Sequence, residues 1–233
     1  MYKYSVSLAL FDYIPVILSA TGLYFVVKTI ASDSFKYSKL TAISACLIVA
    51  SGLSKASWKL IIATSGVDIA LLNNALFVLM TPGFILLTFC LWAFRRQFAN
   101  NPVKQTAWRC PASIIMLFAI ISVYLAFAFP EKRLWFLVLL LPLTLANCVF
   151  SFHAIRHSMK TGSAFAALLF LLNIVGIFVM SGLAQTGDQS EAMQWIEEMV
   201  NAATQGALAL AGYLLWQASE NSPTESLAAS ANS

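Results

Sequence analysis

The stretch Leu40–Thr64 reads LTAISACLIVASGLSKASWKLIIAT and is apolar apart from hydroxyl side chains and two cations, Lys55 and Lys59. It is long enough to cross a bilayer, because a membrane-spanning helix needs about 20 mainly apolar residues. A cation at membrane depth costs about 2.5–3.5 kcal/mol. Two lysines one helical turn apart on one face therefore predict a polar interior in a membrane protein.

The composition of the whole chain supports a membrane protein. The 233 residues are 60% hydrophobic and only 10% charged, whereas a soluble domain carries about 25% charged residues. Lipid must therefore solvate much of the apolar surface. The net charge of +4 comes from cations in short connections. It does not indicate nucleic-acid binding, which needs one basic patch with interleaved aromatic residues.

Signatures of metal, disulfide and hydrolase chemistry are missing from the sequence. The four cysteines lie singly, with no CxxC pair, which argues against a disulfide framework or a zinc site. His153 and His157 have no evident third ligand nearby. The chain contains no HExxH, GxSxG or phosphate-binding loop. No metal site is predicted, and the sequence identifies no cofactor.

Seven apolar segments are long enough to span a bilayer, so the chain is predicted to be an all-α polytopic membrane protein. We expect a seven-helix transmembrane domain over residues 1–217 and a disordered cytoplasmic tail over residues 218–233, which are polar and low in complexity. The predicted helices cover about 6–27, 40–64, 70–94, 108–129, 134–153, 164–184 and 196–217. Short connections predict that sequential helices pack antiparallel.

The distribution of lysine and arginine predicts the orientation. Apart from Lys55 and Lys59, nine cations fall on one predicted side and three on the other. The positive-inside rule places the nine-cation side in the cytoplasm, with the amino terminus outside and the tail inside the plasma or inner membrane. The six tryptophans fall near predicted helix ends and are expected to form interfacial belts.

Sparse landmarks suggest a parallel 3+1+3 repeat that relates helices 1–3 to helices 5–7. Chance agreement is the alternative interpretation, because apolar helices draw on few residue types. Matching positions are separated by 124 to 130 residues: Pro15 and Pro142, Ser51–Leu53 and Ser181–Leu183, Asn74 and Asn201, and Trp92 and Trp216.

Polar residues of four predicted helices gather at similar depth. With a rise of 1.5 Å per residue, Lys59 lies about 7 Å and Lys55 about 13 Å below the outer boundary, and Asp12 lies about 9 Å below it. An ion pair between Asp12 and a lysine is expected, because helices 1 and 2 are antiparallel neighbours. The sequence therefore predicts a mixed-charge pocket that opens to the outside. Its predicted ligand-binding residues are Asp12, Lys55, Lys59, Asn74, Glu198 and Asn201.

Each of these residues also has a structural interpretation. Lys59 can extend to the outer headgroups along its aliphatic stem. Asp12 and the lysines can form a purely structural pair. Glu198 can lie above the bilayer on a solvated extension of its helix, and the asparagines can join helices to one another.

The leading functional prediction is a transporter or permease for a small polar solute, an anion if Lys55 and Lys59 hold it. Asp12 or Glu198 would be a counter-charge or a proton-coupling group. One alternative is a seven-helix receptor, or a membrane subunit of a larger complex, with a protein partner on the basic cytoplasmic loops. Another is an intramembrane enzyme that modifies lipid. The lipid bilayer is a predicted partner in all three cases.

Overall fold

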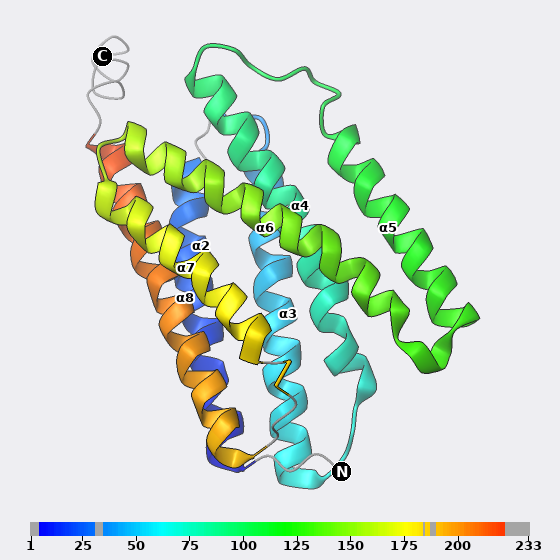
Figure 1. Cartoon of the computed structure of the whole chain (residues 1–233). Coiled ribbons are helices and arrows are strands. Elements are labelled where there is room, and N and C mark those ends of the chain that lie inside the picture. Colours follow the sequence, from blue (N-terminus) through cyan, green and yellow to red (C-terminus); the bar gives the residue numbers. More distant parts are fainter. Residues whose placement is uncertain (1–4, 31–34, 184, 187–189, 222–233) are drawn as a thin grey trace.

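A computed structural model describes residues 5–30, 35–183, 185–186 and 190–221, and over these residues the protein is helical with no strands (Figure 1). The predicted all-α class is therefore confirmed. The elements are α1 (Val6–Phe11), α2 (Tyr13–Ile30), α3 (Ser38–Ser65), α4 (Ala70–Phe98), α5 (Arg109–Ala128), the 3-10 helix η1 (Pro130–Lys132), α6 (Leu134–Lys160), α7 (Ala164–Leu183) and α8 (Glu191–Glu220).

Six spans are long and apolar enough to cross a membrane, with α1 and α2 together forming the first. The chain is thus a membrane-type helical bundle. The seventh predicted segment is also helical and forms α8. It is more polar than the six spans and is not apolar enough to count as a seventh, so its crossing of the membrane stays a prediction. α8 continues through Glu220, three residues past the predicted boundary at residue 217. Residues 222–233 of the predicted tail lie outside the described residues.

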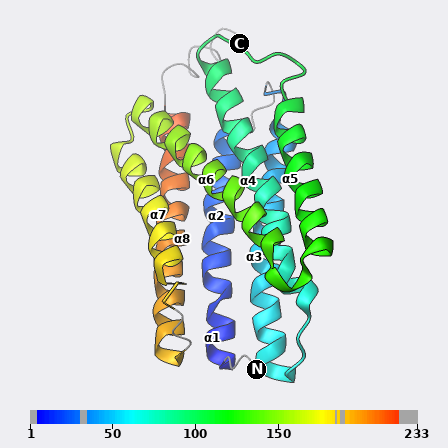
Figure 2. The ribbon, with the colours of Figure 1, turned by 45° about the vertical axis from the view of Figure 1, so that its right-hand side comes forward.

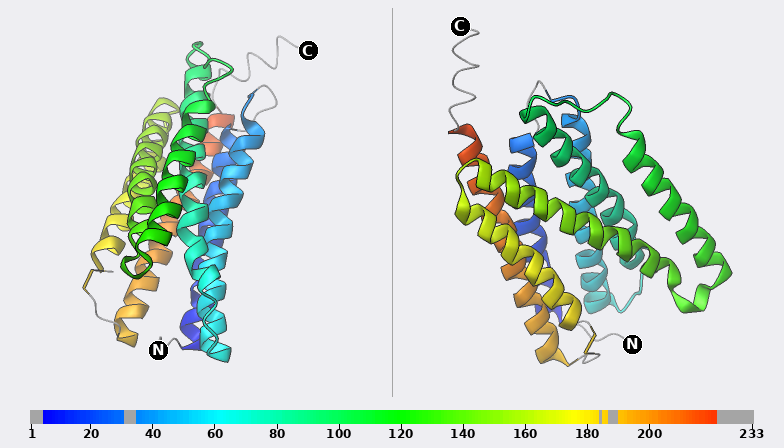
Figure 3. Two further views of the ribbon diagram at one scale, coloured as in Figure 1. Left: turned by 90° about the vertical axis from the view of Figure 1, so that its right-hand side faces the viewer. Right: turned by 45° about the horizontal axis from the view of Figure 1, so that its top comes forward.

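Six of the long helices form a closed ring. α2 packs against α8, α8 against α7, α7 against α6, α6 against α4, α4 against α3, and α3 against α2. α5 stands outside this ring, against α6 and more weakly α4, as the right-hand view of Figure 3 shows. Only Pro111 and Ser122 of α5 are buried, so most of its apolar surface is left for lipid.

The order in which the helices neighbour one another around the ring is compatible with the predicted repeat. Exchanging α2, α3 and α4 with α6, α7 and α8 turns every contact in the ring into another contact in the ring. Gly52 and Gly182, the middle residues of the matched triplets Ser51–Leu53 and Ser181–Leu183, however, have different surroundings. A methyl group on Gly52 would touch Val16, whereas one on Gly182 would meet open space. The repeat stays a prediction.

Close helix crossings and interhelical hydrogen bonds hold the ring together. A Cβ atom on Gly212 of α8 would lie only 2.5 Å from the carbonyl oxygen of Gly22 in α2, so only glycine permits this crossing. Between α4 and α6, the hydroxyl groups of Thr81 and Thr88 donate to backbone carbonyls at 3.1 and 2.8 Å. The seven-residue spacing of these threonines places both on the same face of α4.

The hydrophobic core lies toward one end of the ring. It is built from the later parts of α2, α4, α6 and α8 and from the earlier parts of α3 and α7. The opposite end contains α1, the end of α3 and the start of α8, which lie together in Figure 2. The polar residues singled out in the sequence lie toward this second end.

Candidate functional site

A break in the first span places a carboxylate inside the bundle. α1 ends at Phe11, Asp12 forms its C-cap, and α2 begins at Tyr13. The amide of Asp12 still donates to the carbonyl of Leu8 at 3.1 Å, so the chain turns without leaving that group unpaired. Pro15 follows in the first turn of α2, where its missing N–H is tolerated. The Asp12 side chain is buried there, with the whole residue only 6% exposed.

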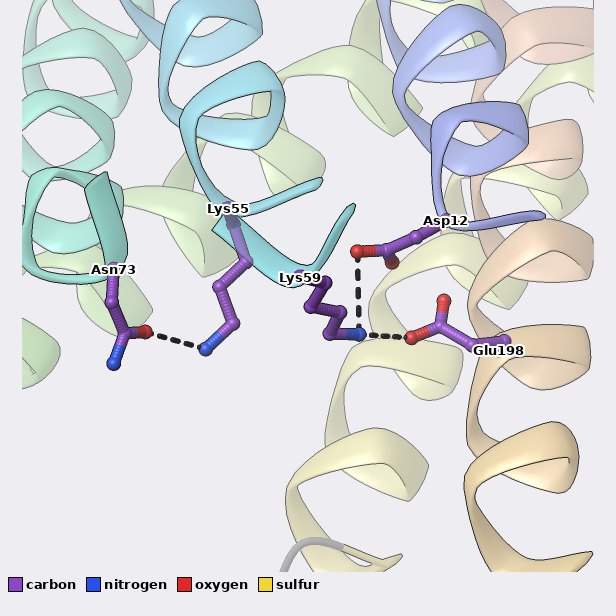
Figure 4. Close-up of polar contacts among 5 residues, drawn as sticks. All are labelled: Asp12, Lys55, Lys59, Asn73 and Glu198. Carbon is purple, nitrogen blue, oxygen red and sulfur yellow. Dashed lines mark hydrogen bonds and ion pairs between the residues drawn. The ribbon is translucent and has the colours of Figure 1, made fainter. Parts of the chain in front are cut away.

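Asp12, Lys59 and Glu198 form a buried cluster that we call the charge triad (Figure 4). Lys59 Nζ lies 3.2 Å from Asp12 Oδ2 and 2.5 Å from Glu198 Oε1. Lys59 therefore does not extend to the headgroups, and the expected pairing with Asp12 is present. Glu198 is 6% exposed rather than solvated above the bundle. One ammonium group thus links three elements, α1, α3 and α8, and faces two carboxylates.

Lys55 points away from the triad (Figure 4). Its ammonium group donates to Asn73 Oδ1 of α4 at 2.7 Å and lies 4.5 Å from the centre of the Trp58 ring. Both of these partners are uncharged. Trp58 was expected in an interfacial belt, but it is 1% exposed, and its indole N–H donates to Asp68 at 2.8 Å.

Lys55 lies in the wall of a pocket of about 260 Å³ between α3, α4 and the start of α6, which we call the Lys55 pocket. Its second cation is Arg133, which precedes α6 and has a positive φ of 47°. The lining residues are Lys55, Trp58, Asn73, Asn74, Phe77, Arg133, Trp135 and Phe136.

The six residues predicted to bind a ligand therefore do not surround one shared cavity. Asp12, Lys59 and Glu198 form the triad, whereas Lys55 and Asn74 line the pocket. Asn201 is half-buried on α8, three residues beyond Glu198, and belongs to neither group. Ligand binding by these residues stays a prediction.

Sequence reasoning missed six residues of the pocket wall: Trp58, Asn73, Phe77, Arg133, Trp135 and Phe136. Asn73 was not among the predicted ligand-binding residues, although its neighbour Asn74 was, and both lie near the start of α4. A usable signal existed for Arg133 and Trp135, because both fall on the predicted outer side, as does the end of the helix that carries Lys55. Their contact with that helix depends on tertiary packing.

The two parts of the site have opposite electrostatic character. With all groups ionised, the triad carries one excess negative charge, whereas the Lys55 pocket carries two cations, two amides and four aromatic rings. The described residues contain no group of three or more His, Cys, Asp or Glu side chains that could hold a metal ion. Comparisons with protein-family models, with curated proteins and with solved structures find no match to this chain.

Proposed function

We propose that this chain is an integral membrane permease for a small anion. The observation that carries the proposal is the different environment of its two intramembrane lysines. Two carboxylates contact Lys59, whereas Lys55 contacts the neutral Asn73 and Trp58 and its side chain lines a pocket with Arg133. Ionisable residues inside a membrane bundle usually mark a substrate or ion pathway. The sequence predicted that Lys55 and Lys59 bind the substrate. In this proposal Lys55 and Arg133 bind it instead.

The charge triad is the coupling element in this proposal. An uncompensated charge in a low-dielectric interior is costly, so the triad favours uptake of one positive charge, most simply a proton. Uptake would weaken one of the two ion pairs of Lys59. Because α3 and α8 pack mainly against α2 and their other neighbours rather than against each other, this change would loosen the link between them. Such loosening is the kind of movement that alternating access requires.

The proposed orientation follows from the positive-inside rule. The Lys55 pocket and the triad lie toward the end with three cations, and the nine-cation end faces the cytoplasm. The pocket would then receive its anion from outside the cell. The cytoplasmic end contains the larger hydrophobic core, which would act as the closed side of the pathway in this conformation.

Uptake into proteoliposomes tests the proposal. Purified full-length protein is reconstituted in neutral lipid, an inward proton gradient is imposed, and uptake of radiolabelled acetate, benzoate and inorganic phosphate is measured. We expect gradient-dependent uptake of at least one of these anions, lost in Lys55→Met and retained in Lys28→Met. Lys28 is a suitable control because it is exposed at the opposite end, over the rings of Tyr24 and Trp216.

One outcome would contradict a permease, and another would contradict the role of Lys55 in it. If folded protein takes up none of the three anions under either direction of the gradient, the proposal is ruled out. Uptake that is equal in wild type and Lys55→Met would remove Lys55 from it. Stoichiometric co-purification of a cytoplasmic partner without uptake would favour the receptor or subunit alternative, and turnover of bilayer lipid would favour the enzyme.

A further inference from the structure

We propose that the Lys55 pocket binds an anion that carries an aromatic ring, with an aromatic carboxylate as the simplest case. This inference names the substrate class of the proposed permease, and it rests on that function only for the transport step. Binding itself follows from the chemistry of the pocket wall, which combines cations, amides and aromatic rings from three helices.

The polar part of the wall is suited to a carboxylate. Lys55 Nζ is held in place by Asn73 Oδ1 at 2.7 Å, and an ammonium group has two further protons to donate. Asn73 accepts through its oxygen, so its NH₂ group is left to donate as well. Arg133 contributes a guanidinium group, whose planar fork matches a carboxylate in bidentate geometry.

The apolar part of the wall is suited to a flat ring. Phe77 of α4 and Phe136 of α6 meet edge to face with their ring centres 4.5 Å apart, which joins the two helices at the pocket. Trp58 and Trp135 complete the aromatic lining. A ring that enters such a wall gains offset-stacked or edge-to-face contacts, each worth about 0.5–1.5 kcal/mol beyond the area buried. Apolar walls with a few placed polar groups are typical of small-molecule sites.

The size of the pocket limits the ligand. Its volume of about 260 Å³ lies just below the range of about 300–1,000 Å³ that is common for ligand sites. One ring with one acidic group fits this space, whereas a nucleotide or a lipid acyl chain does not. The headgroup of an anionic lipid shares the negative charge but lacks the ring, so a preference for aromatic acids separates the two sources.

Calorimetric titration of the purified full-length protein in nanodiscs of phosphatidylcholine tests the inference without transport. The probes are benzoate, cyclohexanecarboxylate, acetate and benzamide. We expect benzoate to bind most tightly. Acetate and benzamide should each bind roughly tenfold more weakly or worse, because the first lacks the ring and the second lacks the charge. Cyclohexanecarboxylate should fall between benzoate and acetate. Equal affinity for benzoate and acetate, or for benzoate and benzamide, would overturn the inference.

Variants of the two cations test where benzoate binds. Lys55→Gln and Arg133→Asn should each weaken benzoate binding roughly tenfold or more, because each removes a charge-assisted hydrogen bond. Asparagine is chosen at position 133 because it tolerates the positive φ there. Lys28→Gln and Lys132→Gln are matched controls and should bind as wild type. If Lys55→Gln does not fold, the exposed Arg133 still decides the question, and unchanged binding in Arg133→Asn counts against the pocket.

Two further comparisons separate the possible failures. The first comparison uses nanodiscs with equimolar phosphatidylglycerol and phosphatidylcholine. If benzoate binding is abolished in them, the site binds lipid headgroups and the inference fails. If benzoate binds through Lys55 but is not taken up by proteoliposomes, the permease fails and the binding site stands. If acetate or phosphate is taken up to the same extent as benzoate, the permease stands and the aromatic preference fails.

Discussion

Lys55 and Lys59 lie one turn apart on α3, yet their ammonium groups reach to opposite sides of the helix, Lys55 toward Asn73 of α4 and Lys59 toward Asp12 and Glu198 (Figure 4). Long flexible stems make this divergence feasible from neighbouring positions on one helix face. α3 therefore separates a cationic pocket from a triad with excess negative charge. The following predictions test this division and the packing around it.

Removing Lys59 should destabilise the protein far more than removing Lys55. Lys59→Met leaves two buried carboxylates without a counter-charge, which should cost about 3–5 kcal/mol. Lys55→Met loses a hydrogen bond to a neutral amide, which should cost about 0.6–1.7 kcal/mol. Titration with a denaturing detergent gives the free energy of unfolding, and Lys28→Met serves as the control. Equal losses for the two lysines would contradict the assigned partners.

Neutralising one acid of the triad should be tolerated better than removing its lysine. Glu198→Gln leaves Lys59 and Asp12 as a one-to-one pair, so we expect a loss of about 1–2 kcal/mol. The double variant Asp12→Asn/Glu198→Gln leaves the ammonium group alone and should cost about 3–5 kcal/mol.

The same unfolding titration checks both variants. Glu197→Gln is the matched control, because Glu197 is adjacent on α8 and is not part of the triad. A double variant as stable as wild type would show that the triad holds no costly charge.

The crossing of α2 and α8 should not accept a methyl group. In Gly212→Ala the new Cβ would lie 2.5 Å from the Gly22 carbonyl oxygen, and the backbone cannot yield cheaply. We expect a loss of about 1–3 kcal/mol in unfolding free energy. Gly206→Ala on the same helix is the control, because its nearest atom is a Leu18 methyl at 3.9 Å. That change should be neutral or slightly stabilising, since alanine favours helices. A neutral Gly212→Ala would argue against this helix pair.

Labelling with a membrane-impermeant maleimide should report the predicted orientation. In a background with the four native cysteines replaced by alanine, Val67→Cys lies in the α3–α4 connection and Asn101→Cys in the α4–α5 connection, both exposed. We expect intact cells to label only Val67→Cys, and permeabilised cells to label both. The reverse pattern would invert the orientation and place the Lys55 pocket toward the cytoplasm.

Part of this organisation was predictable because it depends on composition and spacing alone. A run of about 20 apolar residues predicts a spanning helix whatever surrounds it, and the predicted spans lie largely within the observed helices. The closeness of Asp12 to a lysine was also predictable, since their depths follow from the helical rise and sequential helices are neighbours. The break at Asp12 was not predicted, although Pro15 follows it closely.

The sequence by itself determined the all-α membrane class and the presence of two costly lysines near the end of α3. Only the tertiary structure decided their partners. Glu198 reaches Lys59, and Arg133 joins the Lys55 pocket, because α8 and α6 close a ring with helices far away in the chain. The physical reason is that depth depends on position along one helix, whereas contact depends on the rotation and neighbours of every helix. Periodicity within a single helix does not encode those neighbours.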